Sequence, residues 1–376
     1  MQFRDLKKQY QVLKEKIDSA VIQVMTDANF ISGKQVADLE VQLAEYVGVK
    51  QCITCANGTD ALTLALMAWG VGEGDAVFVP DFTFFASAET VAYEGATPIF
   101  VDVEHSSFNM SPESLEQAIE AVVKEGKLKP KAIVAVDLFG QPADYVSIRK
   151  IADKYGLLIL EDAAQGFGGC IGTKEACSFG DIATTSFFPA KPLGCYGDGG
   201  AIFTDNDEWA ELIRSFRIHG KGADKYDNVR IGMNSRLDTI QAAVLQVKLQ
   251  AFRDYELDAV NKVAERYTEA LSGIVETPTV KEEFYSSWAQ YTILLESEEQ
   301  RNGLQAMLKE QGIPSMVYYP KAMHEQGAFK DTHCVVTDLS VTTELCKRVL
   351  ALPMHPYLAE EEQEVVIEAV KGYLGN

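Results

Sequence analysis

The stretch Ser186-Phe187-Phe188-Pro189-Ala190-Lys191-Pro192-Leu193-Gly194 places a lysine shortly after the end of a predicted strand. The apolar run 181–185 before it predicts that strand, and a glycine-rich turn, 194–200, leads into another at 201–204. Burial lowers the pKa of a lysine, and a neutral amine can form a Schiff base with a carbonyl compound. An ordinary loop lysine is the alternative, because most lysines lie in solvent.

Two acids follow an earlier buried strand. The apolar residues 157–160 predict the strand, and Glu161 and Asp162 come directly after it. Open α/β sheets bind ligands at the carboxyl ends of their strands. A carboxylate at this position can keep a proton on a pyridine nitrogen, which makes the ring an electron sink. The simpler alternative is that the two acids cap the next segment.

A third feature is Cys55-Ala56-Asn57-Gly58-Thr59-Asp60-Ala61-Leu62, which runs from a strand through a turn of small residues into a helix. The free N–H groups and the dipole at such a helix start bind phosphate. The same residues are also ordinary turn and capping residues, so this stretch alone does not settle its role.

Outward from these stretches the chain alternates strands and helices. Strands are predicted at 51–54, 76–80, 97–101, 132–136 and 157–161, and helices at 59–69, 84–94, from 111 onward and at 144–155. This rhythm predicts an α/β fold in which a mostly parallel sheet is covered by helices on both faces.

The pattern changes after residue 204. A helix at 207–216, a basic loop to 234 and a long helical stretch at 237–271 are predicted there. A strand at 288–295, a helix at 298–311, a short strand at 315–317 and a terminal helix after 359 follow. We therefore expect a large α/β domain, residues 1–250, and a smaller α+β domain, residues 251–376.

The composition excludes several classes of partner. The net charge of the 376 residues is −21, which argues against nucleic acids and anionic membranes. No apolar run approaches the roughly 20 residues that a membrane span needs. The first eight residues are amphipathic and do not resemble a signal peptide, so the expected compartment is the cytoplasm.

One segment is basic, although the chain as a whole is strongly acidic. Between positions 214 and 236 six cations face two acids, a local balance of six minus two, or +4. The segment is either a solvated basic face or a surface that faces phosphates. The cations are Arg214, Arg217, Lys221, Lys225, Arg230 and Arg236, and the acids are Asp224 and Asp227.

The seven cysteines are scattered along the chain. Cys52 and Cys55 form a C-x-x-C pair, but no second pair and no histidine pair completes a zinc site. We expect no metal site and interpret the cysteines as reduced, structural thiols.

Five motifs, in this order and spacing, resemble the DegT/DnrJ type of sugar aminotransferases, which depend on pyridoxal 5'-phosphate (PLP) and have fold type I. The resemblance covers nearly the whole chain. The motifs are Asn57-Gly-Thr-Asp-Ala-Leu, Pro80-Asp-Phe-Thr-Phe, Glu161-Asp-Ala-Ala-Gln, Ser186-Phe-Phe-Pro-Ala-Lys and Asn234-Ser-Arg-Leu-Asp.

The resemblance assigns the cofactor site. It implies that Lys191 binds PLP covalently and shuttles a proton, that Asp162 pairs with the pyridine nitrogen, and that Gln165 bonds the phenolic oxygen. Phe84 occupies the ring-stacking position, although a core aromatic on helix 84–94 is the alternative. The implied phosphate ligands are the backbone of Gly58 to Asp60, the Thr59 hydroxyl, Ser186 and, from the neighbouring subunit of a homodimer, Asn234.

The resemblance also implies substrate contacts, at Phe30, Arg236, Tyr318 and Tyr319. Tyr318-Tyr319 stands where a His-Tyr pair is common, and Ala190 stands where a serine is common, so the exact sugar is open. His219, His324 and His355 are further candidates for sugar contacts, and each could equally be structural.

The leading hypothesis is an aminotransferase that moves the amino group of L-glutamate to a keto-sugar nucleotide. Among family members the chain looks most like those that aminate a UDP-linked 2-acetamido-2-deoxy-3-keto-hexuronic acid for surface polysaccharide such as O-antigen. A 4-keto-6-deoxy sugar nucleotide is an alternative substrate. A PLP sugar dehydratase is disfavoured because such relatives replace the lysine with histidine, and a non-catalytic PLP-binding regulator is the remaining alternative.

Overall fold

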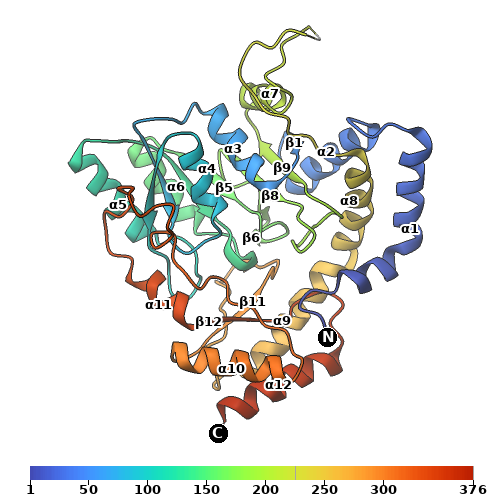
Figure 1. Ribbon diagram of the computed structural model, residues 1–376, viewed down its shortest axis with the longest axis vertical. Coiled ribbons are helices and arrows are strands. Elements are labelled where there is room, and N and C mark those ends of the chain that lie inside the picture. The colour runs from blue at the N-terminus through green and yellow to red at the C-terminus, as the bar shows by residue number, and fades with distance from the viewer. Residues whose placement is uncertain (225, 376) are drawn as a thin grey trace.

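The computed structural model describes residues 1–224 and 226–375, and its core is a seven-stranded sheet (Figure 1). Strand β9 pairs antiparallel with both its neighbours, β1 and β8, whereas the remaining pairs are parallel. The prediction of a mostly parallel sheet is therefore confirmed. In sheet order the strands are β1 (Gln51–Cys55), β9 (Gly200–Thr204), β8 (Ile182–Ser186), β5 (Leu158–Asp162), β4 (Lys129–Val136), β2 (Asp75–Pro80) and β3 (Thr97–Val101).

Helices cover both faces of the sheet, because successive side chains of a strand point to opposite sides. In β2, Val77 and Val79 pack into one buried cluster, and Ala76 and Phe78 pack into another. The first face carries α3 (Gly58–Ala68), α4 (Ala86–Tyr93) and α7 (Asp207–Phe216). The opposite face carries α5 (Pro112–Glu125) and α6 (Tyr145–Tyr155), together with α2 (Lys34–Val47) and α8 (Thr239–Ala251).

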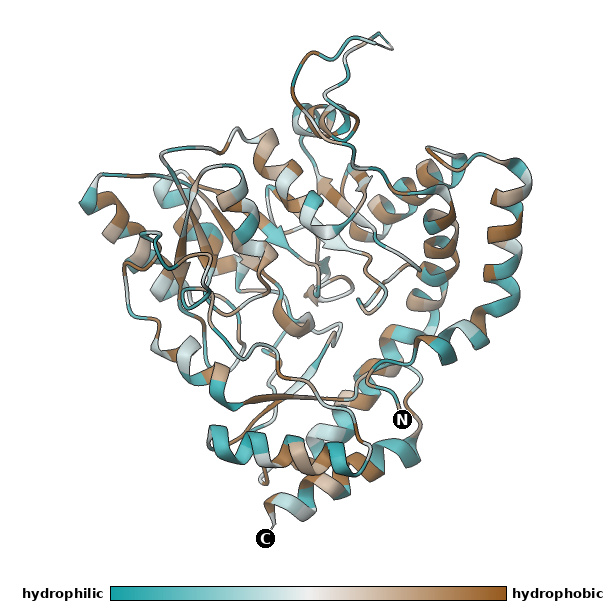
Figure 2. Ribbon diagram, in the orientation of Figure 1, coloured by the Kyte–Doolittle hydropathy of each residue, from teal (hydrophilic) through white to brown (hydrophobic). Residues whose placement is uncertain are grey.

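The longest helix, α1 (Leu6–Asp27), lies outside this layer and packs on α8 (Figure 1). The helices at the periphery show both hydrophilic and hydrophobic sectors, as expected for elements that bury one face (Figure 2). Among the described helices, none combines the length and the apolar character that crossing a membrane requires.

The elements that follow α8 pack around a separate hydrophobic cluster. It is built around the antiparallel pair β11 (Tyr291–Leu294) and β12 (Val349–Leu352). The helices α9 (Leu257–Leu271), α10 (Glu298–Glu310) and α12 (Glu360–Leu374) surround the pair. A π-helical turn, Phe252–Glu256, connects α8 to α9, and we propose it as the domain boundary, next to the predicted position 250.

The two parts share contacts across this boundary. Met323, Phe329, Cys334 and Leu345 pack into the cluster of the large part, although they follow residue 251. A small sheet also joins the parts, since β10 (Phe284–Tyr285) pairs with β6 (Cys170–Ile171), which in turn pairs with β7 (Lys174–Glu175). The short turn Leu138–Gly140 and the helix α11 (Ser340–Arg348) complete the elements.

Several sequence predictions need correction. The predicted strand at 315–317 is a single bridge between Met316 and Ala351, and the predicted helical stretch 237–271 is interrupted by the π-helical turn. The helix predicted at 84–94 begins at Ala86, so Phe84 lies in the turn before it. The small sheet and α11 were not predicted.

The cysteines are free thiols, and all except Cys170 are buried. Cys52 and Cys55 belong to different hydrophobic clusters, because they project from opposite faces of β1. Within the described residues, no group of three or more His, Cys, Asp and Glu side chains is arranged to hold a metal ion.

Candidate active site

A cavity of about 720 Å³ lies at the carboxyl ends of β5 and β8, beside the start of α3. Open α/β sheets bind ligands at this position. The cavity brings together most of the predicted site residues: Gly58, Thr59, Asp60, Phe84, Asp162, Gln165, Ser186, Lys191, Tyr318 and Tyr319. Ala190 lines it as well.

Of the two acids that end β5, Asp162 lines the cavity and Glu161 does not. The Asp162 carboxylate accepts hydrogen bonds from the Ser87 hydroxyl (2.8 Å) and the Ala164 amide (3.2 Å). Burial raises the pKa of Asp162, whereas these bonds and Lys191 act in the opposite direction. Glu161 points away from the cavity and accepts from the backbone amides of residues 177, 179 and 180, so its role is to fix that loop.

Lys191 lies in the turn after β8, and its amide donates to the Phe188 carbonyl (2.9 Å). Burial lowers the pKa of the Lys191 amine; the Asp162 carboxylate opposes this, and the Arg4 guanidinium adds to it. The amine is thereby moved toward its neutral, nucleophilic form, as the sequence predicted for a lysine at the end of a buried strand.

The start of α3 forms an anion-binding turn. Asn57 caps the helix by accepting a hydrogen bond from the Asp60 amide (2.8 Å), which leaves that amide unavailable to a ligand. The Gly58 and Thr59 amides have no acceptor within the described part of the chain. A Cβ atom on Gly58 would come within 2.7 Å of Ser186 Cβ, so glycine allows the turn to close on the end of β8.

Gln165 and two aromatic residues form the remaining wall. The Gln165 Oε1 atom accepts from the Phe139 amide (2.9 Å), and its Nε2 atom donates to the Tyr319 hydroxyl (3.1 Å). The ring of Phe84 lies 6.3 Å from that of Tyr319, and Phe84 is 55% exposed. An aromatic side chain this exposed is not a core residue, which removes the alternative considered for Phe84.

Phe30, Asn234 and Arg236 lie outside this cavity. Their segments are neighbours, because the Thr239 amide donates to the Phe30 carbonyl (2.9 Å) and Ile31 forms a bridge with Asp238. The side chain of Arg236 has no hydrogen-bond or ion-pair partner among the described residues. We call these three residues the outlying group.

A loop that we call the basic arm, residues 218–234, projects beyond α7 and ends at the outlying group (Figure 1). Its two sides pair at Ile218–Asn234 and Lys221–Asn228. Gly220 has a φ of +67°, and a Cβ atom there would lie 1.9 Å from the Arg230 carbonyl oxygen, so the close approach requires glycine. The arm is thus a folded element, although Lys225 lies outside the described residues.

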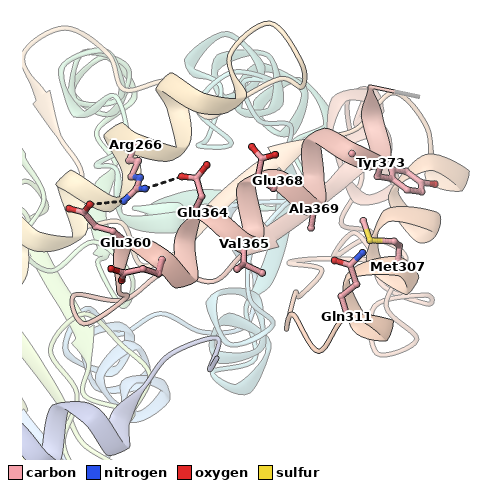
Figure 3. A pocket seen from close by; sticks show the side chains of 11 residues that line it. Arg266, Met307, Gln311, Glu360, Glu364, Val365, Glu368, Ala369 and Tyr373 are labelled. Atoms are coloured by element: carbon pink, nitrogen blue, oxygen red, sulfur yellow. Dashed lines mark hydrogen bonds and ion pairs between the residues drawn. The ribbon is translucent and has the colours of Figure 1, made fainter.

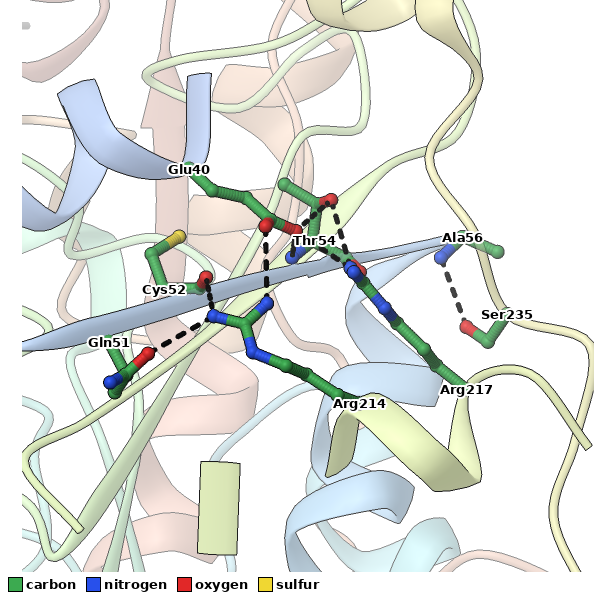
Figure 4. Close-up of polar contacts among 8 residues, drawn as sticks. All are labelled: Glu40, Gln51, Cys52, Thr54, Ala56, Arg214, Arg217 and Ser235. Atoms are coloured by element: carbon green, nitrogen blue, oxygen red, sulfur yellow. Dashed lines mark hydrogen bonds and ion pairs between the residues drawn. The ribbon is translucent and has the colours of Figure 1, made fainter. Parts of the chain in front are cut away.

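Two of the six cations counted in the basic segment are neutralised from a distant part of the chain (Figure 4). Glu40, on α2, accepts from Arg214 (3.2 Å) and Arg217 (2.7 Å), and also from Thr54 on β1. The alternative of a phosphate-facing surface does not hold for these two residues, because both guanidinium groups are held by this carboxylate. Burial opposes ionisation of Glu40, but Arg217 and the Thr54 amide leave its pKa below the ordinary value.

The three histidine candidates do not line the cavity. The ring of His324 contacts the buried carboxylate of Asp81 (2.6 Å), and His355 is buried, which lowers its pKa to about 4. His219 lies in the basic arm, and its amide donates to the Met233 carbonyl. His324 and His355 have structural surroundings, and a sugar contact by His219 is open only outside the cavity.

Several residues of the cavity were not predicted, and two of them bring polar groups to it. Ser87 is buried and bonds both Asp162 and Thr83, and its spacing of four residues from Thr83 at a helix start was the available signal. Gln290, from the part after residue 251, reaches the cavity, and its buried Oε1 atom has no hydrogen-bond partner within the described residues. No local pattern marked Gln290, since only the packing of the two parts brings it there.

A larger cavity, of about 1140 Å³, lies between α9, α10 and α12 (Figure 3). Its one cation, Arg266, is already paired with Glu360 (3.2 Å) and Glu364 (2.9 Å). It offers acids and an apolar floor but no lysine, histidine or cysteine among its lining residues. The cavity that is lined by candidate catalytic side chains is therefore the one at the ends of β5 and β8.

The chain belongs to the DegT/DnrJ/EryC1/StrS aminotransferase family, whose model matches residues 11–371. Members of this family are PLP-dependent aminotransferases, so the predicted activity class and cofactor are confirmed. The recognition carried by the five motifs was correct.

Three relatives show which members of the family the chain resembles. The chain is 44% identical to UDP-2-acetamido-2-deoxy-3-oxo-D-glucuronate aminotransferase of Pseudomonas aeruginosa, over 98% of this chain and 99% of that one. It is 43% identical to a "Pleiotropic regulatory protein" of Geobacillus stearothermophilus, with 97% and 96% of the chains covered. It is 39% identical to UDP-N-acetyl-3-dehydro-alpha-D-glucosamine 3-aminotransferase of Acidithiobacillus ferrooxidans, with 95% and 94% covered.

Solved structures share the fold. A DegT DnrJ EryC1 StrS aminotransferase from Brucella abortus superposes with a TM-score of 0.97 at 50% identity, with both chains covered completely. NtdA from Bacillus subtilis, with bound cofactor PMP, has a TM-score of 0.88 at 31% identity, with 97% of this chain and 82% of that chain covered. These neighbours confirm fold type I.

The residues of the cavity fit this cofactor. An acid, an amine and an anion-binding turn are the groups that the pyridine nitrogen, the aldehyde and the phosphate of PLP require. They line one cavity here as Asp162, Lys191 and the Gly58–Thr59 turn. The close contact of Gly58 with Ser186 leaves the two free amides and two hydroxyl groups at the same end of the cavity.

Proposed function

We propose that the protein transfers the amino group of L-glutamate to the 3-keto group of a UDP-linked 2-acetamido-2-deoxy-hexuronic acid. The observation that carries this proposal is the cavity in which Lys191, Asp162 and the Gly58–Thr59 turn converge. The names of the Pseudomonas and Acidithiobacillus relatives, a 3-oxo and a 3-dehydro sugar enzyme, support amination at carbon 3.

Five residues of the cavity have a defined part in this proposed reaction. PLP, when bound, supplies an electron sink for the electrons released as the C–H bond at the amino carbon breaks. Lys191 provides the amine that holds the cofactor and then carries the proton from one carbon to the other. Asp162 keeps the ring nitrogen protonated, and Ser87 orients Asp162 through the bond to its Oδ2 atom. Gln165 faces the phenolic oxygen, and Phe84 covers the ring.

The phosphate is held by the Gly58 and Thr59 amides, with the hydroxyl groups of Thr59 and Ser186. The Asp60 amide, predicted as a further ligand, is already bonded to Asn57 and drops out of this set. We expect Asn234 of a second copy of the chain to complete it. The support is that the basic arm projects beyond α7 and that Asn234 does not line the cavity of its own chain. A homodimer with shared sites accounts for both observations.

We assign substrate recognition to Tyr318 and Tyr319 in the cavity and to Phe30 and Arg236 of the partner copy. The planar fork of Arg236 suits a carboxylate, and its lack of a partner within the described residues leaves it available. A site that pairs a carboxylate rejects a neutral analogue strongly. The uronic acid is therefore favoured over the uncharged 4-keto-6-deoxy sugar.

The second candidate function is regulatory, because the name of the Geobacillus relative describes a regulatory protein. The two functions differ in a direct assay. Incubation with PLP and L-glutamate should yield 2-oxoglutarate and the amino form of the cofactor. A chain that binds PLP without this half-reaction would be a regulator and would contradict the proposal.

A panel of keto-sugar nucleotides, read by mass spectrometry after incubation with glutamate, tests the substrate. The UDP-linked 3-keto uronic acid should gain an amino group, and better turnover of a 4-keto-6-deoxy sugar would contradict the substrate assignment. Such a nucleotide-linked product is a precursor of surface polysaccharide, including lipopolysaccharide, which is assembled from the cytoplasmic side. We accordingly propose a cytoplasmic enzyme of polysaccharide biosynthesis.

Arg236→Lys tests whether Arg236 binds the sugar or the amino donor, since glutamate also carries carboxylates. Lysine keeps the charge and loses the fork. If Arg236 binds the sugar, the variant should slow amination of the sugar and leave the glutamate half-reaction near the wild-type rate. Equal slowing of both half-reactions would mean that Arg236 serves the donor as well.

A further inference from the structure

A buried cluster of charges lies behind the Lys191 turn, and the proposed mechanism does not use it. Glu256 is 3% exposed and accepts hydrogen bonds from Gln9 (2.8 Å) and Tyr357 (2.6 Å). Two cations share its surroundings: Lys248, which is 1% exposed, and Arg4. Two positive groups thus face one carboxylate, which is an expensive arrangement for residues that serve packing alone.

Arg4 connects this cluster to the catalytic turn. Its Nη2 atom donates to the carbonyl oxygen of Lys191 (2.8 Å) and lies 3.4 Å from the carbonyl oxygen of Pro192. The Arg4 guanidinium also interacts electrostatically with the buried carboxylate of Glu256. Arg4 therefore holds the backbone of the Lys191 turn by hydrogen bonding and connects it electrostatically to this cluster.

The residue next to Arg4 contacts the opposite wall of the cavity. The ring of Phe3 packs edge-on against that of Tyr318, with centroids 6.2 Å apart. The Phe3 carbonyl accepts from the amide of Met354, just after β12. Segment 3–4 therefore bridges the lysine turn and the part of the chain that carries Tyr318.

We propose that Arg4 is a positioning residue of the transamination: it fixes the Lys191 turn from behind and, with Phe3, couples it to the Tyr318 wall. The inference rests on the proposed role of Lys191. That lysine must reach the cofactor and then two different carbon atoms, so a small displacement of its backbone is costly. A misplacement of about 1 Å can reduce a rate by on the order of 100-fold.

The charge of Arg4 gives the proposal a signature that packing alone would not give. Burial lowers the pKa of Lys191, Asp162 raises it, and Arg4 lowers it further. The charged groups that act on the Lys191 amine are Asp162 from β5 and Arg4, and Asp60 from α3 and Asp198 from the turn before β9 line the same cavity. Removing the Arg4 charge should move the protonation of the Lys191 nitrogen to a higher pH.

The experiment compares the PLP-loaded wild type with Arg4→Gln, Arg4→Lys and Phe3→Leu, and uses Lys8→Gln as the control. Lys8 is exposed on the first turn of α1, and its side chain makes no polar contact among the described residues. Two quantities are measured: kcat of the glutamate half-reaction, and the pH midpoint of the absorption change of the lysine-linked cofactor.

Arg4→Gln should lower kcat by about 10- to 100-fold and raise the pH midpoint. Arg4→Lys should keep the midpoint but lower kcat, because lysine retains the charge and lacks the guanidinium Nη2 atom that contacts both carbonyl groups. Phe3→Leu should lower kcat less and leave the midpoint unchanged. Lys8→Gln should match the wild type in both measurements.

The proposal is overturned if Arg4→Gln matches Lys8→Gln in both measurements. It is also overturned if Arg4→Gln unfolds at a lower temperature yet keeps the wild-type kcat and midpoint, since Arg4 would then be structural. If Arg4→Gln does not fold, the kcat of Arg4→Lys decides in the same way. A wild type that lacks the glutamate half-reaction would contradict the proposed function instead, so the two failures are distinguishable.

Discussion

The residues that line the cavity and the outlying group differ in what surrounds them. Asp162, Lys191 and the Gly58 turn come from the ends of neighbouring strands, and their contacts lie within one subunit. Phe30, Asn234 and Arg236 belong to segments that backbone contacts hold in place, yet none of the three lines that cavity. The difference teaches that a segment can be well fixed by its backbone while its side chains stay outside the cavity of the same chain.

The most severe test of this comparison is Lys191→Ala. The variant should fold and bind PLP without a covalent link, and it should lose turnover by more than about 1000-fold, because both the amine and the proton carrier are gone. Lys150→Ala, at an exposed position on α6, is the matched control. Borohydride reduction and peptide mapping check the assignment, which fails if the pyridoxyl group is found on another lysine.

Asp162→Asn tests the opposite end of the cavity. The carbonyl oxygen of asparagine can still accept from the Ala164 amide while its NH2 group donates to the Ser87 hydroxyl, but the side chain cannot hold a charge opposite the ring nitrogen. The glutamate half-reaction should slow by on the order of 100- to 1000-fold while the fold is retained. A decrease of less than about tenfold, measured by single-turnover absorbance, would assign the electrostatic role elsewhere.

Glu40→Gln tests the junction of α7 with β1, because Glu40 accepts hydrogen bonds from both of these regions (Figure 4). Removing the charge leaves two partly buried arginines unpaired, and we expect a loss of about 2 kcal/mol of unfolding free energy. Urea denaturation measures it, with the exposed Glu45→Gln on the same helix as control. An equal stability of the two variants would contradict the junction.

The same junction predicts a dependence on pH. The pKa of Glu40 in the folded protein lies below its ordinary value of 4.5, so the unfolded chain binds the proton more readily. The contribution of Glu40 to stability is therefore complete above pH 4.5 and is lost as the pH falls below it. The stability difference between the wild type and Glu40→Gln should shrink over that range, and a constant difference would contradict the ionised pair.

The smallest effect comes from mixing two inactive variants. If each site uses its own Lys191 and the Asn234 of its partner, a heterodimer of Lys191→Ala and Asn234→Ala chains contains one intact site. Random exchange should restore about a quarter of the wild-type activity, since half of the dimers are mixed and half of their sites are intact. Mixing each variant with itself is the control, and no recovery after demonstrated exchange would place Asn234 outside the partner's site.

The sequence predicted the central sheet and brought most of the proposed cofactor residues to one cavity, because both the strands and the residues that end them are encoded locally. Buried strands appear as apolar runs, and Asp162 and Lys191 follow such runs directly. The helix 207–216 was predicted with its observed bounds for the same reason: it is amphipathic and begins after Asn206, whose side chain caps it.

The failures concern contacts between distant parts of the chain. The sequence left open whether Arg214 and Arg217 face phosphates, because a count of charges along the chain cannot include Glu40, more than 170 positions away. Gln290 was missed because its place in the cavity depends on how the two parts pack. The two-residue strands of the small sheet are too short to show any periodicity.

The half-buried Cys170 offers a practical handle for spectroscopy. It is the one thiol of the described residues that is not buried, so a small thiol-reactive fluorophore or spin label should attach there selectively. Cys170 lies opposite Tyr285 in the pairing of β6 with β10, where the two parts of the chain meet. Because Cys170 does not line the cavity, a probe at this position would report on the contact between the two parts without disturbing the cavity itself.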